Sequence, residues 1–180
     1  MKPSAITKSL YFDTDIGMFH VNTNIVPEAK GEIRVSLLEK TPMLQLPTGM
    51  SVVRCRAALL QVSTMTPIKH ITFSCTFKGS ITASPCTGEY LDAQEWENST
   101  NIVCVGTEDI EKLEMRQPFF ASYNCAKPPI TFSDNSIDIH LLNVPKNSEL
   151  SMHFIIAENL LPEPTECSAW FAVDFPHSNL

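Results

Sequence analysis

Apolar and polar residues alternate along several stretches of this chain. The alternation is strict over residues 71–77, where Ile, Phe, Cys and Phe are separated by Thr, Ser and Thr, and it returns over residues 32–37 and 137–141. Successive side chains of a β-strand point to opposite faces of a sheet, so this period of two predicts strands with one buried face and one face toward water. The chain is therefore expected to be mainly β.

The strands expected from this pattern are Met18–Val26, Glu32–Glu39, Lys69–Ile81, Asn101–Gly106, Phe119–Cys125, Ile130–Phe132, Ser136–Asn143, Glu149–Glu158 and Cys167–Phe175. Two of them contain apolar runs without alternation, at residues 154–156 and 170–173. Such runs are typical of central strands that are covered on both faces.

Two segments are expected to be helical. In Val52–Ser63 the residues Val52, Cys55, Leu59 and Val62 fall on one helical stripe, although the same segment also fits a strand, and we favour the helix. Thr107 followed by acidic residues predicts a short capped helix that ends at Met115. Polar residues in Glu89–Thr100 predict a loop.

These elements predict one domain over residues 1–180, with residues 1–10 as a flexible tail. The 13 prolines against six glycines fall between the apolar runs, as expected for many short strands joined by firm turns. We predict a single-domain antiparallel β-sandwich or a jelly-roll-like barrel with one or two short helices.

The charge and the aromatic residues suggest one interaction patch. A formal net charge of −7 disfavours nonspecific binding to nucleic acid or to an anionic membrane, because both need a basic surface. Arg54 and Arg56 are the only closely spaced arginines, and Trp96 lies in an acidic segment. We predict a possible interaction patch at Arg54, Arg56 and Trp96, with any contact to a nucleocapsid or a membrane weak and local.

The six cysteines leave two interpretations open. The chain starts without the apolar segment of a signal peptide, which favours reduced thiols and a cytoplasmic location. The alternative is a secreted domain with three disulfides, in which the sequon at Asn98 would carry a glycan.

Catalytic and cofactor motifs are not evident. The segment Tyr11–Gly17 contains Asp13 and Asp15 and resembles the calcium-binding start of the nucleoside hydrolases, but Met, Phe and His stand where that family has further acids. A polar turn between two strands is the preferred interpretation, and an enzyme that uses these two acids with a divalent cation is a minor one. The histidines and cysteines lack the close spacing of a zinc motif, and His140 and His153 are expected on the polar, solvent-facing sides of alternating strands. We predict no catalytic residue, no metal site and no cofactor.

The chain resembles small structural proteins of plant viruses. Its length and layout are similar to those of the matrix proteins of plant rhabdoviruses, and the strand–turn–strand segment Ile130–Ala157 is similar to the core of plant-virus movement proteins. The resemblance implies a non-enzymatic structural or assembly protein of the matrix type, present in host cytoplasm and virion, that binds copies of itself and a protein partner. The alternatives are the secreted recognition domain, with an extracellular protein ligand, and a movement-type protein.

Overall fold

Two antiparallel sheets form the molecule, which a computed structural model describes for residues 4–87, 91–116, 129–163, 167–174 and 177–180. The five-stranded sheet has the order β1 (Ile6–Thr14), β2 (Gly17–Pro27), β5 (Ile68–Lys78), β10 (Ser136–Val144) and β9 (Ile130–Ser133). The six-stranded sheet has the order β3 (Ile33–Lys40), β4 (Arg54–Thr64), β11 (Ser148–Leu160), β8 (Asn101–Glu108), β7 (Leu91–Glu97) and β6 (Ser84–Thr87). The predicted mainly β fold is confirmed, in the form of a β-sandwich.

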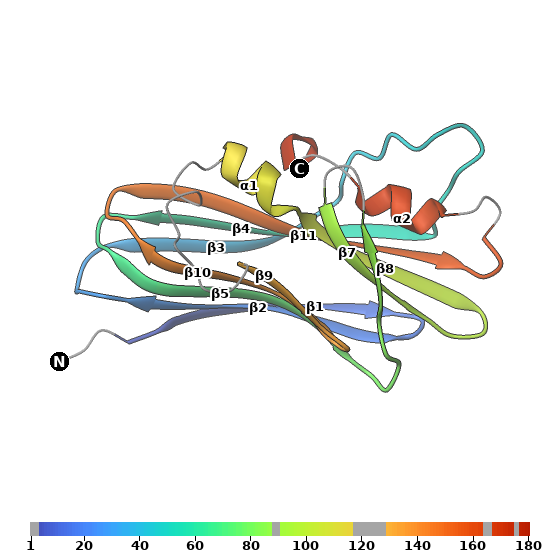
Figure 1. Cartoon of the computed structure of the whole chain (residues 1–180), viewed down its shortest axis with the longest axis horizontal. Coiled ribbons are helices and arrows are strands. Elements are labelled where there is room, and N and C mark those ends of the chain that lie inside the picture. Colours follow the sequence, from blue (N-terminus) through green and yellow to red (C-terminus); the bar gives the residue numbers. More distant parts are fainter. Residues whose placement is uncertain (1–3, 88–90, 117–128, 164–166, 175–176) are drawn as a thin grey trace.

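Three short helical elements complete the fold. They are α1 (Ile110–Arg116), α2 (Ser168–Val173) and the 3₁₀ turn η2 (His177–Asn179). Both α-helices and the C-terminus lie on the same side of the six-stranded sheet (Figure 1).

The main core lies between the sheets. Strand β11 contributes Leu150, Met152, Phe154 and Ile156 to it, and β5 contributes its aromatic positions. A second, smaller cluster lies on the outer face of the six-stranded sheet, where α2 packs against Ile155 and Ala157. Both faces of β11 are therefore buried along much of its length, as its apolar run predicts.

The predicted helix Val52–Ser63 is wrong, because this segment forms β4, the partner of β3 and β11. Ala58, Leu60 and Val62 face the core between the sheets, while Ala57 faces the outer cluster. The apparent helical stripe arises because both faces of this strand are covered, so apolar residues occur at every spacing.

The predicted strand Cys167–Phe175 is also wrong where the structure describes it, because Ser168–Val173 forms α2. Ala169, Ala172 and Val173 are buried at positions i, i+3 and i+4, which is the helical spacing. The carboxylate of Glu163 accepts hydrogen bonds from the backbone N–H groups of Ser168 and Ala169 and so satisfies the start of the helix.

Three strands lie where neither a strand nor a helix was expected. Ile6–Thr14 forms β1, so residues 6–10 are not a flexible tail, Ser84–Thr87 forms β6, and Leu91–Glu97 forms β7 inside the predicted loop. Only Phe12 of β1 is fully buried, as in many edge strands, and this leaves little apolar alternation to detect.

Two further predictions need comment. The helix predicted from Thr107 begins instead after Asp109, whose Oδ1 accepts a hydrogen bond from the N–H of Lys112. The predicted strand Phe119–Cys125 lies outside the described residues.

Candidate functional site

The outer face of the six-stranded sheet carries a polar region at one end. Strand β11 alternates there, so that Glu149, Ser151 and His153 point to the outer face while their neighbours enter the core between the sheets. Glu108, the last residue of β8, lies on the neighbouring strand beside His153. The hydroxyl of Thr107 donates a hydrogen bond to the backbone oxygen of His153 over 2.8 Å and ties the two strands together.

A groove of about 510 Å³ opens beside this region. Residues of β3, β4, β11 and α1 line it, namely Arg34, Val35, Ser36, Gln61, Val62, Ser63, Arg116, Glu149, Leu150 and Ser151. Its wall includes two arginines, three serine hydroxyls and the amide of Gln61. Two of its residues lead to the neighbouring polar groups, since Arg116 contacts Glu108 and Ser151 contacts His177.

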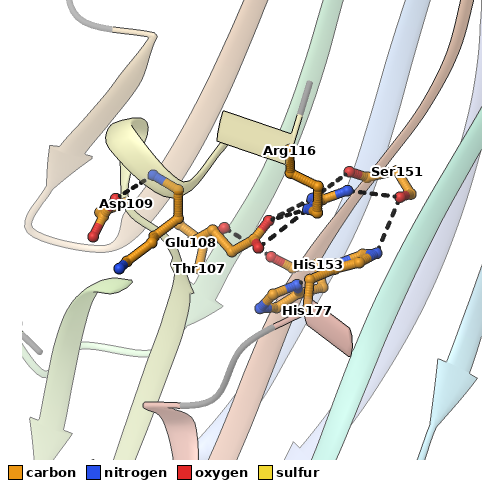
Figure 2. Close-up of polar contacts among 8 residues, drawn as sticks. Thr107, Glu108, Asp109, Arg116, Ser151, His153 and His177 are labelled. Carbon is orange, nitrogen blue, oxygen red and sulfur yellow. Dashed lines mark hydrogen bonds and ion pairs between the residues drawn. The ribbon is translucent and has the colours of Figure 1, made fainter. Parts of the chain in front are cut away.

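Arg116 organises the polar region (Figure 2). Its guanidinium forms an ion pair with the carboxylate of Glu108, which is only 4% exposed. It also donates to Ser151, through Nη1 to Oγ at 3.0 Å and through Nη2 to the backbone oxygen at 2.8 Å. A buried carboxylate requires such a partner, because an unpaired charge there is strongly destabilising.

Two histidines from distant parts of the chain meet beneath this ion pair. Nδ1 of His153 lies 2.8 Å from Nδ1 of His177, and Nε2 of His177 lies 3.0 Å from Oγ of Ser151. Burial lowers the pKa of His153 well below its usual value, with further lowering from His177 and Arg116. Burial and Arg116 also lower the pKa of His177, against an opposing effect of Glu108. These effects favour the neutral form of both imidazoles.

The arrangement allows two kinds of chemistry. Glu108, His153 and His177 each offer a ligand atom within 4.8 Å of the others, which is a donor set for a divalent metal ion. Ser151, His177 and His153 also have the distances of a nucleophile, a base and an orienting group. However, the Ser151 hydroxyl already accepts a hydrogen bond from Arg116, so the serine arrangement is the less favourable interpretation.

The sheet edges differ between the two sides of the sandwich. On one side β1 and β3 are edge strands of nine and eight residues. On the other side β6 and β9 have four residues each, and β6 contains Pro85. Short strands and prolines protect sheet edges from pairing with another chain, so β1 and β3 are the open edges among the described residues.

The predicted patch residues Arg54 and Arg56 lie close together but are occupied within the chain. Both donate hydrogen bonds to the backbone oxygen of Asp13, Arg54 also pairs with Glu158 at 3.2 Å, and Arg56 lies over the ring of Phe12. They connect the two sheets at the β1–β2 turn.

Trp96 does not belong to a surface patch, and this prediction is wrong. Its side chain is 0% exposed and packs in the main core against Phe19 and Phe77. As part of β7 it alternates inward, so the acidic neighbours face away from it.

The remaining candidate residues from the sequence have structural roles in the fold. Asp13 and Asp15 lie at the β1–β2 turn, as the polar-turn interpretation predicted, and Arg54 is 3.8 Å from Asp15. Cys55, Cys75, Cys86 and Cys104 carry free thiols, which leaves too few cysteines for the three-disulfide alternative.

The site residues were not predicted from the sequence. His153 was expected on the polar face of its strand, and it does lie on the outer face, but it is 1% exposed because α1 and η2 cover that position. Neither His177 nor Arg116 belongs to a sequence motif. His153 and His177 are 24 residues apart, so they do not have the close spacing of a metal-binding motif.

Comparison with protein-family models, with curated proteins and with solved structures returned no match for this chain. Within the described residues, no helix is long and apolar enough to span a membrane.

Proposed function

We propose that this chain is a non-enzymatic structural or assembly protein that associates with copies of itself through β3. The observation that carries the proposal is the open edge of the six-stranded sheet. Among the described residues, strand β3 pairs with β4 alone; it contains no proline and has exposed residues at Arg34, Leu38, Glu39 and Lys40. An edge strand of this kind offers unpaired backbone donors and acceptors to a second strand.

The side chains of β3 favour pairing with an identical strand. In an antiparallel pair of two copies centred on Ser36, the outer-face residues oppose each other as Glu32 with Lys40 and Arg34 with Leu38. This register sets opposite charges across the interface at its two ends and places no like charges directly opposite each other on that face. Cross-strand pairs of opposite charge contribute roughly 0.2–1 kcal/mol each.

Strand β1 is a less suitable edge. The backbone oxygen of Asp13 already accepts hydrogen bonds from Arg54 and Arg56, so one end of this strand is engaged within the chain. The apolar Leu38, 43% exposed on β3, adds a hydrophobic contact that an associated copy would cover.

Substitutions at Leu38 test this register. Leu38→Lys places a lysine opposite Arg34 of the other copy, at two symmetric positions in each dimer. Because these like charges repel, we expect the dimer dissociation constant to rise by about tenfold. Leu38→Glu sets an anion opposite Arg34 and should leave association unchanged or stronger. Sedimentation equilibrium over a range of protein concentrations at low salt measures both.

The controls separate register from general polarity. Leu142→Lys changes a residue of similar exposure, 40%, on β10 of the other sheet and should leave association unchanged. The double variant with Arg34→Glu and Leu38→Lys should recover association. A wild-type chain that stays monomeric at high concentration and low salt would contradict the proposal, as would equal weakening by Leu38→Lys and Leu38→Glu.

Within this proposal, the matrix-type role in host cytoplasm and virion and the binding of a further protein partner remain predictions from the resemblance to plant rhabdovirus matrix proteins. Self-association through a sheet edge is a property that such a role requires. It does not depend on a catalytic residue.

A further inference from the structure

We propose that Glu108, His153 and His177 form a binding site for a divalent transition metal ion of the zinc type. The three residues come from β8, β11 and η2, and one ligand atom from each lies within 4.8 Å of the others. Two imidazole nitrogens and a carboxylate oxygen are a common protein ligand set for zinc, with a fourth position left for water.

The two histidines direct the same ring nitrogen toward each other. A metal ion binds the unprotonated nitrogen of an imidazole, and Nδ1 of His153 lies 2.8 Å from Nδ1 of His177. Four-coordinate zinc with 2.0–2.1 Å bonds needs about 3.3 Å between ligand nitrogens, so the rings would separate by about 0.5 Å on binding.

The ring of His153 lies inside the ligand cluster rather than at the surface. Its Nδ1 faces Nδ1 of His177 at 2.8 Å, while its Nε2 is buried without a hydrogen-bond partner among the described residues, and the whole residue is 1% exposed. Buried polar atoms normally have a partner in the protein or in a bound group, so this ring is incompletely satisfied within the chain.

Neighbouring residues hold two of the proposed ligands, Glu108 and His177, in place. Arg116 binds the Glu108 carboxylate, and Oγ of Ser151 lies 3.0 Å from Nε2 of His177. Hydrogen bonds of this kind orient metal ligands and select the ring nitrogen that faces the metal. The positive charge of Arg116 repels the metal ion, and the negative charge of Glu108 offsets this repulsion.

The inferred site lies within one chain and is independent of self-association through β3. It connects η2 to the six-stranded sheet, since His177 lies on η2 whereas Glu108 and His153 lie on strands β8 and β11. Metal binding would therefore stabilise the attachment of this turn.

Zinc titration of the full chain, stripped of metal with a chelator, tests the site. We expect one zinc ion bound per chain in isothermal titration calorimetry, at a stoichiometry that does not change with protein concentration. Zinc should also raise the melting temperature, and a chelator should reverse that rise. Cobalt, as a spectroscopic probe, should give the intense visible absorption of a four-coordinate site.

The variants identify the ligands. His177→Ala should abolish zinc binding and the zinc-dependent rise in melting temperature, and circular dichroism should show a retained fold because His177 lies on a three-residue turn and is only partly buried. Glu108→Gln, which keeps the shape of the side chain, should also abolish binding.

The matched control is the second histidine pair of the molecule. His70 and His140 stack at 5.7 Å between ring centroids on the five-stranded sheet, and His140→Ala should leave zinc binding unchanged. The proposal is overturned if the wild-type chain binds no zinc at micromolar free metal, if His177→Ala retains binding, or if His140→Ala removes it.

Discussion

The outer face of the six-stranded sheet has two ends with opposite character, although the same two strands, β8 and β11, run through both. At one end α2 covers Cys104, Ile155 and Ala157, which belong to an apolar cluster. At the other end, one step further along each strand, Glu108 and His153 are buried in a network of charges and hydrogen bonds.

The boundary between the two ends is a single pair of residues. Gly106 on β8 lies opposite Ile155 on β11. A Cβ at Gly106 would lie 2.9 Å from the side chain of Leu91 and 3.2 Å from Val173, so the absence of a side chain there allows α2 to approach the sheet.

The difference shows what each kind of burial does. The apolar end gains stability from area removed from water, without directional requirements. The polar end must satisfy each charge with a particular partner, so it adds little net stability but holds titratable groups in one geometry. Substitutions at the two ends should therefore differ in size, in pH dependence and in how they can be rescued.

The largest effect is expected at the apolar end. Ile155→Ala removes a fully buried side chain beneath α2 and should lower the free energy of unfolding by about 3 kcal/mol, measured by urea denaturation. Leu160→Ala, on the same strand but 53% exposed, should change it by less than about 0.5 kcal/mol. Similar losses in both variants would show that α2 does not cover Ile155.

A smaller effect is expected from the ion pair at the polar end. Arg116→Ala leaves the buried carboxylate of Glu108 without its partner, and because the Arg116 side chain is 28% exposed we expect a loss of about 2 kcal/mol. Adding Glu108→Gln should recover part of the loss, since it removes the unpaired charge. Arg34→Ala breaks an exposed pair with Glu32 and should have almost no effect.

The smallest change is a pH dependence that only the polar end should show. The pKa of His153 is lower in the folded chain than its usual value of 6.5, so below that pH the unfolded chain binds more protons than the folded chain. The contribution of His153 to stability is present above pH 6.5 and is lost as the pH falls, by up to about 1.4 kcal/mol per pH unit.

The test compares unfolding free energies between about pH 7.5 and pH 5.5. His153→Gln should lose less stability on acidification than the wild-type chain. Thr107→Val removes the hydrogen bond to the His153 backbone and should cost about 1 kcal/mol without changing the pH slope. Equal slopes in wild type and His153→Gln would contradict a lowered pKa of this residue.

The sequence predicted the elements whose two faces differ. Strands β2, β3, β5 and β10 were placed within one or a few residues of their observed bounds, because each has one face on the core and one on solvent. Strands β8 and β11 were also predicted, although both of their faces are largely buried. Prediction failed for two other buried segments. Strand β4 is covered on both faces, so the spacing of its apolar residues also fits a helix. The helix α2 is so short that its apolar residues were interpreted as a buried strand.

The residues of the candidate site could not be predicted from local alternation alone. Alternation correctly placed His153 on the outer face of β11, but the covering by η2 depends on the path of the whole C-terminal segment. Trp96 shows the reverse case, since polar neighbours suggested exposure while the strand alternation of β7 turns this side chain into the core.

The sequence by itself determined that the chain is mainly β and where many of its strands lie, because backbone alternation is a local property that each segment carries alone. Only the tertiary structure decided which edges stay open and which polar residues meet. In the part of the chain that the structure describes, strand order leaves β3 without a second neighbour, and the packing of α1 and η2 on one sheet brings one ligand atom each of Glu108, His153 and His177 within 4.8 Å of one another. Both are relations between distant segments, so a pattern within a single segment does not record them.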